Sequence, residues 1–281
     1  MSSRTSSPQP PIKKSFIREL LTFSLVFAFA AHPLEARAGS DAPNVARIIE
    51  AYPDALGKIE GNELVWRDGT RMPLDDGHGV KAFADWIENP DIEDMLRVPY
   101  PAGAPADAPA PEIDPGRARN AVFFEKMYGD CRKGDVRAKL KTIVWLPSKA
   151  KQRLQVTTVN GVADRLEAIS RELDALPAEF DKYLVPAGGT YNCRPIAGTN
   201  RVSAHGYGIA IDIAVAQSDY WRWASGAAAG KVAFRNRIPD QIVRIFERHG
   251  FIWGGRWYHY DTMHFEYRPE LLPPPPSGAR N

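Results

Sequence analysis

The chain has 281 residues, 44% of them hydrophobic and 25% charged, and a formal net charge of +2. These fractions are those of an ordinary globular protein, and the length suits one catalytic domain with extensions. The small net charge excludes a protein that binds nucleic acid through a generally basic surface.

Residues 1–38 have the pattern of a secretory signal peptide. A basic stretch with Lys13 and Lys14 precedes an apolar run, residues 20–31, that is short for a membrane span, and residues 36–38 form an A-x-A cleavage site. We therefore expect an exported protein, periplasmic or secreted, with no stable membrane span after cleavage; an uncleaved anchor is the alternative. Beyond the leader, 31 basic and 32 acidic side chains remain, so overall charge predicts no nucleic-acid partner.

Residues 39–98 form a first block with three expected elements. Apolar side chains recur at helical spacing over residues 45–52, and Asp-Gly at 68–69 between two apolar runs indicates a hairpin. A second amphipathic turn or helix is expected at 83–87. The block is interpreted as an extension that packs on the rest of the chain, with a small wall-binding module as the alternative.

Residues 99–117 are rich in Pro and Ala, which predicts an extended linker or a segment that follows the surface. A helix is expected over residues 118–128, where the catalytic domain begins, and this domain is predicted to extend from 118 to 272. The Pro-rich end, residues 273–281, is predicted to be a disordered tail without a catalytic role.

Inside the catalytic domain, strands are expected over residues 142–146 and 154–159. Asn160 is a candidate N-cap for an amphipathic helix that runs to about residue 176.

The second half of the domain starts with two expected short strands, residues 183–185 and 190–193. An amphipathic helix is predicted over residues 239–249, with Gly250 as its C-terminal cap. Residues 251–253 are expected to restart extended structure.

Residues 203–215, SAHGYGIAIDIAV, are the most informative stretch. Their isoleucines point to one side of a predicted strand, and Asp212 lies between two alanines on the other. Two glycines allow the chain to bend, so that His205 could turn back toward Asp212. A neutral imidazole and a carboxylate held in this way are plausible zinc ligands.

Residues 261–266, DTMHFE, supply a third candidate ligand, His264, and a carboxylate three positions before it. Two histidines and one carboxylate, with a fourth position left to water, make up a catalytic zinc site. Asp261 is then the candidate general base, close to that water without being a ligand.

The first stretch reads SxHxxGxAxD, spelled by Ser203, His205, Gly208, Ala210 and Asp212, and a carboxylate-x-x-His-Phe-Glu motif follows it. Together the two motifs resemble the zinc D-Ala-D-Ala carboxypeptidase and L-Ala-D-Glu endopeptidase family, the VanY-like peptidases of bacterial cell walls. The resemblance covers about residues 140–272.

The resemblance implies one zinc ion per chain, held by His205, Asp212 and His264, with Asp261 as the base. It also implies that Arg194 stabilises the oxyanion of the tetrahedral intermediate. The fold that we predict is α+β: a small, mostly antiparallel sheet with helices on one face and a zinc cleft on the other, as in the hedgehog-type zinc peptidases.

Four further residues are candidates for substrate contact: Ser203, Glu266, His259 and Trp257. Glu266 could instead contact a metal ligand from behind or be a plain surface carboxylate. His259 is a rival metal ligand because it lies near His264 in the sequence, although the family pattern uses His264.

Cys131 and Cys193 are the two cysteines of the chain. In an oxidising compartment they are predicted to form a disulfide, and two buried free thiols are the alternative.

Export and the resemblance imply peptidoglycan stem peptides as substrate, with L-Ala-D-Glu endopeptidase activity expected first and removal of a terminal D-Ala second. A zinc-containing wall-binding module without catalysis is the alternative of another class, because the hedgehog signalling domain shares this metal arrangement. A serine hydrolase is disfavoured because the sequence around Ser203 lacks a G-x-S-x-G elbow. The sequence does not predict an oligomeric state.

Overall fold

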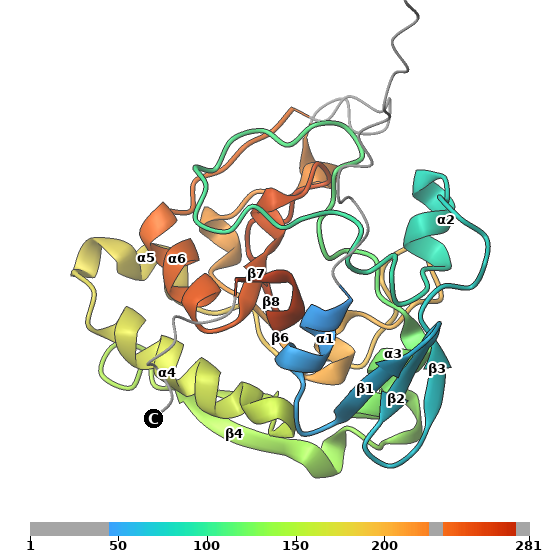
Figure 1. Ribbon diagram of the computed structural model, residues 1–281. Coiled ribbons are helices and arrows are strands. Elements are labelled where there is room, and N and C mark those ends of the chain that lie inside the picture. The colour runs from blue at the N-terminus through green and yellow to red at the C-terminus, as the bar shows by residue number, and fades with distance from the viewer. Residues whose placement is uncertain (1–44, 225–232, 274–281) are drawn as a thin grey trace, which may run out of the picture. The chain divides into compact units, whose positions relative to one another are not determined.

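The computed structural model describes residues 45–224 and 233–273 (Figure 1). The described residues belong to one compact unit. The predicted leader, and all of the predicted tail except its first residue, lie outside the described residues. In the part of the chain that the structure describes, no helix is both long enough and apolar enough to cross a membrane.

The N-terminal part is built on a small antiparallel sheet. Helix α1 (Ala46–Ala51) leads into strands β1 (Leu56–Glu60), β2 (Glu63–Trp66) and β3 (Arg71–Pro73), which pair in the order β1-β2-β3, and helix α2 (Phe83–Glu88) follows. Both predicted helices and the predicted hairpin between β2 and β3 are confirmed. Strand β1 was not predicted.

The middle of the chain contains a two-stranded sheet covered by a helix. Helix α3 (Ala121–Tyr128) precedes strands β4 (Leu140–Trp145) and β5 (Gln152–Thr157), which form an antiparallel pair. Helix α4 (Val162–Asp174) packs along β4 (Figure 1), and it buries one apolar side, as expected of the predicted amphipathic helix. Helix α5 (Asp181–Leu184) follows.

The C-terminal part contains the sheet that carries the two sequence motifs. Strands β6 (Ala210–Asp212), β8 (His264–Tyr267) and β7 (Phe251–Trp253) are antiparallel in the order β6-β8-β7. Helix α6 (Asp240–Arg248) packs against this sheet, where the ring of Phe246 stacks on that of Phe265 at a centroid distance of 3.9 Å.

Short 3-10 helices connect these elements: Cys131–Lys133, Arg137–Lys139, Val159–Gly161, Ala178–Phe180, Ala204–Tyr207, Val215–Gln217, Trp221–Trp223, Gly254–Arg256 and Pro269–Leu271.

The predicted class, α+β with small antiparallel sheets, is therefore confirmed, but the strands form three small sheets where one was expected. At the outer edge of β6 the structure has only an isolated bridge, between Gly189 and Asp212.

Three local predictions were wrong. Asn160 does not cap α4: it has a φ of 55°, its amide donates to the Tyr128 hydroxyl at 3.2 Å, and Gly161 is the N-cap. Residues 183–185 were expected to be extended, but Tyr183 and Leu184 belong to α5 because packing overrides the strand preference of single residues. Residues 190–193 form no regular strand.

The segment between α2 and α3 runs along the C-terminal part of the chain. The Tyr100 hydroxyl donates to Glu247 Oε1 at 2.8 Å and accepts from the backbone N–H of Trp253 at 2.9 Å. The Trp257 indole donates to the carbonyl of Pro115 at 2.7 Å. These contacts hold the Pro-rich segment on the protein, while the domain boundaries at 98 and 117 stay predictions.

Candidate functional site

Asp212 and His264 are direct neighbours across the sheet. They are opposite residues in the antiparallel pair of β6 and β8, so their side chains leave the sheet on the same face. The residues that flank them, Ile211 and Phe265, are fully buried and point to the other face, toward the core. The alternating sequence pattern and the register of the two strands therefore bring one carboxylate and one imidazole together.

His205 reaches the same point from the short helix before β6. Gly208 ends that helix with a φ of +71°, and a Cβ there would lie 3.0 Å from Leu140 and 3.1 Å from the backbone of Thr157, so only glycine fits this turn. The ring Nδ1 of His205 lies 2.6 Å from the carbonyl of Thr190. Because a carbonyl only accepts, Nδ1 carries the proton and Nε2 is left free to bind a metal.

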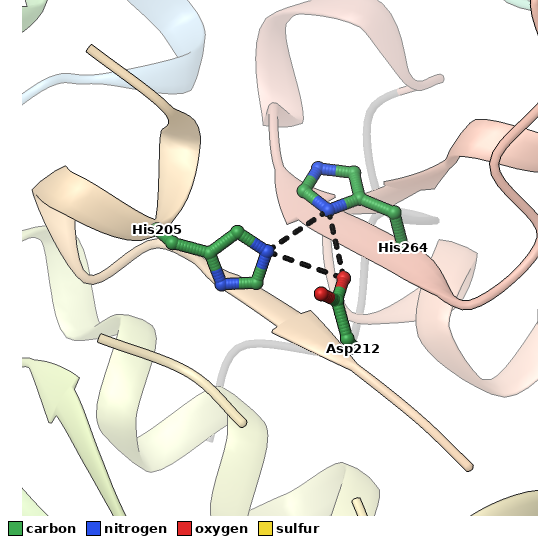
Figure 2. A group of neighbouring side chains, drawn as sticks. All are labelled: His205, Asp212 and His264. Carbon is green, nitrogen blue, oxygen red and sulfur yellow. Dashed lines mark hydrogen bonds and ion pairs between the residues drawn. The ribbon is translucent and has the colours of Figure 1, made fainter. Parts of the chain in front are cut away.

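Figure 2 shows the three side chains pointing toward one another. His205 Nε2, Asp212 Oδ1 and His264 Nδ1 are separated by 3.2, 3.1 and 3.2 Å. Ligand atoms about 2.0–2.1 Å from a tetrahedral zinc ion lie roughly 3.3 Å apart. The donor set and its spacing thus fit zinc.

The charges at this point favour a cation. The neighbouring imidazoles hold the pKa of Asp212 well below its usual range, although burial opposes this shift. Burial alone would lower the pKa of His264, but hydrogen bonds to Asp212 and Glu266 raise it to about 10. The two carboxylates, Asp212 and Glu266, thus favour positive charge at His264, and a metal ion bound between Asp212 and the imidazoles would supply it.

Asp261 lies beside this group without joining it. Burial raises the pKa of its carboxyl to about 6; the negative charge of Asp212 adds to the shift, and the positive charge of His264 opposes it. Its Oδ1 is buried and has no hydrogen-bond partner among the described residues. A carboxylate with this pKa and a free oxygen is suited to take up a proton near neutral pH.

One comparison with known proteins matches the part of the chain that carries this group. A family model described as D-alanyl-D-alanine carboxypeptidase matches residues 197–267. The resemblance to that family is confirmed over this segment. No curated protein and no solved structure matches the chain.

The matched segment, residues 197–267, contains the three candidate ligands and Asp261, whereas Arg194 lies just before it. The backbone of Arg194 is close to the first motif, since its carbonyl accepts from the N–H of Ser203 at 3.1 Å. Its side chain is exposed, and its Nη1 lies 3.4 Å from the carbonyl of Pro195. Ser203 is buried at the start of the helix that carries His205.

Glu266 is fully buried behind His264. His264 Nε2 lies 2.9 Å from Glu266 Oε2, so the proton on Nε2 is donated to the carboxylate and Nδ1 faces the candidate metal position. This burial excludes a surface carboxylate and leaves no exposed oxygen for the predicted substrate contact. The other alternative agrees with the geometry: Glu266 contacts the candidate ligand His264 on the side away from the candidate metal position.

His259 does not join the ligand group. Buried Asp114 holds it: the backbone N–H and ring Nδ1 of His259 lie 3.0 and 2.8 Å from the two oxygens of Asp114. The rings of Phe83 and Trp221 both pack against the imidazole, at 5.4 and 4.7 Å between centroids. His259 thus keeps Nε2 available at a partly exposed position, as a substrate contact requires. Trp257 is only 4% exposed, and its ring packs 5.6 Å from that of His264.

The predicted disulfide between Cys131 and Cys193 is confirmed. It attaches the residue next to Arg194 to the end of α3. Gly206 packs closely against it, since a Cβ at this position would lie 3.1 Å from Cys131 Sγ. The bridge therefore braces the helix that carries His205.

A second group of carboxylates, Asp75, Asp76 and Asp91, also comes together among the described residues. Lys81 already supplies a cation there: its Nζ lies 2.6 Å from Asp76, 3.4 Å from Asp91 and 2.7 Å from Asp94. This group is an ion-pair network around the buried Lys81 rather than a second metal site.

Three residues of the site's surroundings were not found from the sequence: Asp114, Arg119 and Thr190. Arg119 donates to Glu266, and Thr190 accepts from His205. They lie outside both motifs, and only the folded chain brings them near the histidines.

Proposed function

We propose that this chain is an exported, zinc-dependent peptidase that hydrolyses the stem peptides of peptidoglycan. One observation carries the proposal: His205, Asp212 and His264 converge within 3.2 Å of one another beside a carboxyl group, Asp261, whose pKa is raised to about 6. The match of residues 197–267 to a carboxypeptidase family supports peptide hydrolysis as the reaction.

In this proposal one zinc ion is held by His205 Nε2, Asp212 Oδ1 and His264 Nδ1. Zinc bound there would act as a Lewis acid: it would lower the pKa of a water molecule to about 7 and polarise the peptide carbonyl. The protein holds both imidazoles in the correct tautomer, through the carbonyl of Thr190 and the carboxylate of Glu266.

Asp261 then acts as the proton carrier. As an ionised carboxylate it accepts a proton from the attacking water, and as a carboxylic acid it delivers that proton to the nitrogen of the leaving amine. Its free Oδ1 is the atom that we assign to this transfer. To Arg194, whose guanidinium is exposed, we assign stabilisation of the negative oxygen that develops on the carbonyl.

We assign the substrate cleft to the face of the β6-β8-β7 sheet that carries the candidate ligands, because α6 packs against the other face through Phe246 and Phe265. Asp212 and His264 leave the sheet on the cleft face. The segment from Tyr220 to Trp223 flanks the cleft, because Tyr220 bridges to Asp261, and Trp223 is 60% exposed. We assign these rings to contact with the peptide or its sugar.

Cleavage within the stem peptide, between L-Ala and D-Glu, is the activity that we place first. A carboxypeptidase needs a cation for the free carboxylate of its substrate. Three arginines near the cleft are already paired with carboxylates of the protein: Arg117 with Asp114, Arg119 with Glu266 and Arg201 with Glu88. An endopeptidase needs no such cation.

Removal of a terminal D-Ala is the second candidate, favoured by the description of the matching family. In that case Arg194 is the group that we expect to bind the terminal carboxylate, because its guanidinium is exposed.

The test is to incubate the purified protein with peptidoglycan fragments, with and without a zinc chelator, and to identify the products by mass spectrometry. We expect products only without chelator, and their masses distinguish the two bonds. A zinc-loaded Asp261→Asn protein is the matched control. Absence of any product from zinc-loaded wild-type protein would refute the enzyme and leave a zinc-holding binding module.

A further inference from the structure

The carboxylate of Glu266 is buried and receives an arginine from a distant part of the chain. Arg119 lies 147 positions away in the sequence, and its Nε and Nη2 donate to the two oxygens of Glu266 at 3.0 and 2.6 Å. Arg119 is 9% exposed and Glu266 0%. Such a two-pronged, buried arginine-carboxylate pair fixes the plane and direction of both groups.

Glu266 passes this orientation on to a metal ligand. Its Oε2 accepts the proton of His264 Nε2 at 2.9 Å, and the same oxygen accepts from Arg119 Nη2. The other oxygen also accepts from Arg268 at 3.2 Å, but Arg268 is shared with Glu270. Without Arg119, one arginine would have to balance two buried carboxylates.

The backbone around Arg119 is fixed as well. Asn120 caps α3, its amide donates to the carbonyl of Pro90 at 2.9 Å, and Ala118 is fully buried. Gly116 fits tightly, because a Cβ there would lie 2.5 Å from Leu271 and the residue has a φ of +79°. Arg119 is therefore held rigidly before it meets Glu266.

We propose that Arg119 is a positioning residue for the metal centre, acting on His264 through Glu266. The metal site is thus completed by a segment that lies outside the family match at residues 197–267. The inference rests on the proposed function only in that the three ligands bind zinc, and it is independent of the bond that is cleaved.

The expected effect is on zinc affinity. Removing a partner that orients a ligating histidine weakens metal binding by about 10- to 100-fold. We expect this loss in Arg119→Met and a smaller one in Arg119→Lys, which keeps the charge but not the two-pronged geometry. Arg71→Met is the matched control, because Arg71 also pairs with carboxylates, those of Glu60 and Glu63, but on the exposed surface.

The measurements are the zinc dissociation constant, from competition with a chromophoric chelator, and the visible absorption spectrum of the cobalt-substituted protein. We expect weaker binding and a changed cobalt spectrum in both Arg119 variants and wild-type values in Arg71→Met. A purely structural role of Arg119 would lower the melting temperature but leave both values unchanged in the folded protein, and that result would overturn the proposal.

If Arg119→Met does not fold, the double variant Arg119→Met/Glu266→Gln decides. The neutral amide removes the unpaired buried charge, so the double variant is expected to fold, yet an amide holds the Nε2 proton of His264 less firmly. Wild-type zinc affinity in the folded double variant would also overturn the proposal. Failure of wild-type protein to bind zinc is a different outcome, because it refutes the proposed function itself.

Discussion

Replacement of Asp261 by Asn removes the proposed general base with almost no change in side-chain volume. Loss of a positioned general base costs about two to four orders of magnitude in turnover. Zinc should remain, because Asp261 is not one of the three converging ligands. The fold should remain too. Because the pKa of Asp261 is raised in the folded protein, its ionised carboxylate destabilises the fold at pH values above the ordinary pKa of aspartate, and the neutral amide removes this cost.

The pKa of Asp261 also predicts how the wild-type rate depends on pH. With a pKa of about 6, the carboxyl is about 90% ionised at pH 7 and about 10% at pH 5. We therefore expect kcat/KM to fall between pH 7 and pH 5, by up to about tenfold. A bound zinc ion lowers the pKa of a nearby carboxyl, so the acidic limb should lie at pH 6 or below.

The assay follows hydrolysis of a stem-peptide fragment by liquid chromatography between pH 5 and 8, with the zinc content measured at each pH. Zinc content separates loss of the base from loss of the metal. Near-normal turnover of the zinc-loaded Asp261→Asn protein at pH 7 would remove Asp261 from this role. The same conclusion would follow if the pH-rate profile of this variant kept the acidic limb of the wild-type profile.

Three further predictions concern the frame of the site. His205→Ala and His264→Ala should each reduce bound zinc well below one per chain by elemental analysis, and one equivalent in either folded variant would contradict the ligand assignment. The Cys131→Ser/Cys193→Ser protein should lose about 4 kcal/mol of unfolding free energy in urea titrations, as a bridge across 62 residues implies; an unchanged midpoint would count against this estimate. Gly208→Ala should cost more than about 1 kcal/mol, because its φ is +71° and its Cβ would crowd neighbouring atoms; equal thermal stability would show that this turn can relax.

The first motif could be interpreted correctly because its pattern is local. Alternation of isoleucine with alanine and Asp212 has the period of a strand, and the structure buries the isoleucines as that period requires. The glycines before it indicated a turn that could carry His205. Helix α6 was equally readable, because its apolar residues repeat at helical spacing and Gly250 follows it.

The contacts around the site could not be predicted, because they are set by pairing over long distances. Nothing in the sequence shows that His264 lies opposite Asp212, which depends on the register of β8 against β6. Nor does it show that Asp114, from the predicted linker, contacts His259, or that Arg119, at the start of the next predicted helix, contacts Glu266. Asn160 shows a local limit, since a residue suited to an N-cap uses its amide to bind Tyr128 instead.

The convergence of His205, Asp212 and His264 on one metal ion is tested most directly by X-ray diffraction from zinc-loaded crystals at the zinc absorption edge. We predict one strong anomalous peak bonded to His205 Nε2, Asp212 Oδ1 and His264 Nδ1, with Asp261 beside it and not bonded to it. The account would be contradicted by an anomalous map with no peak at this position. It would also be contradicted by a zinc ion bonded to Asp261 or His259 in place of one of these three ligands.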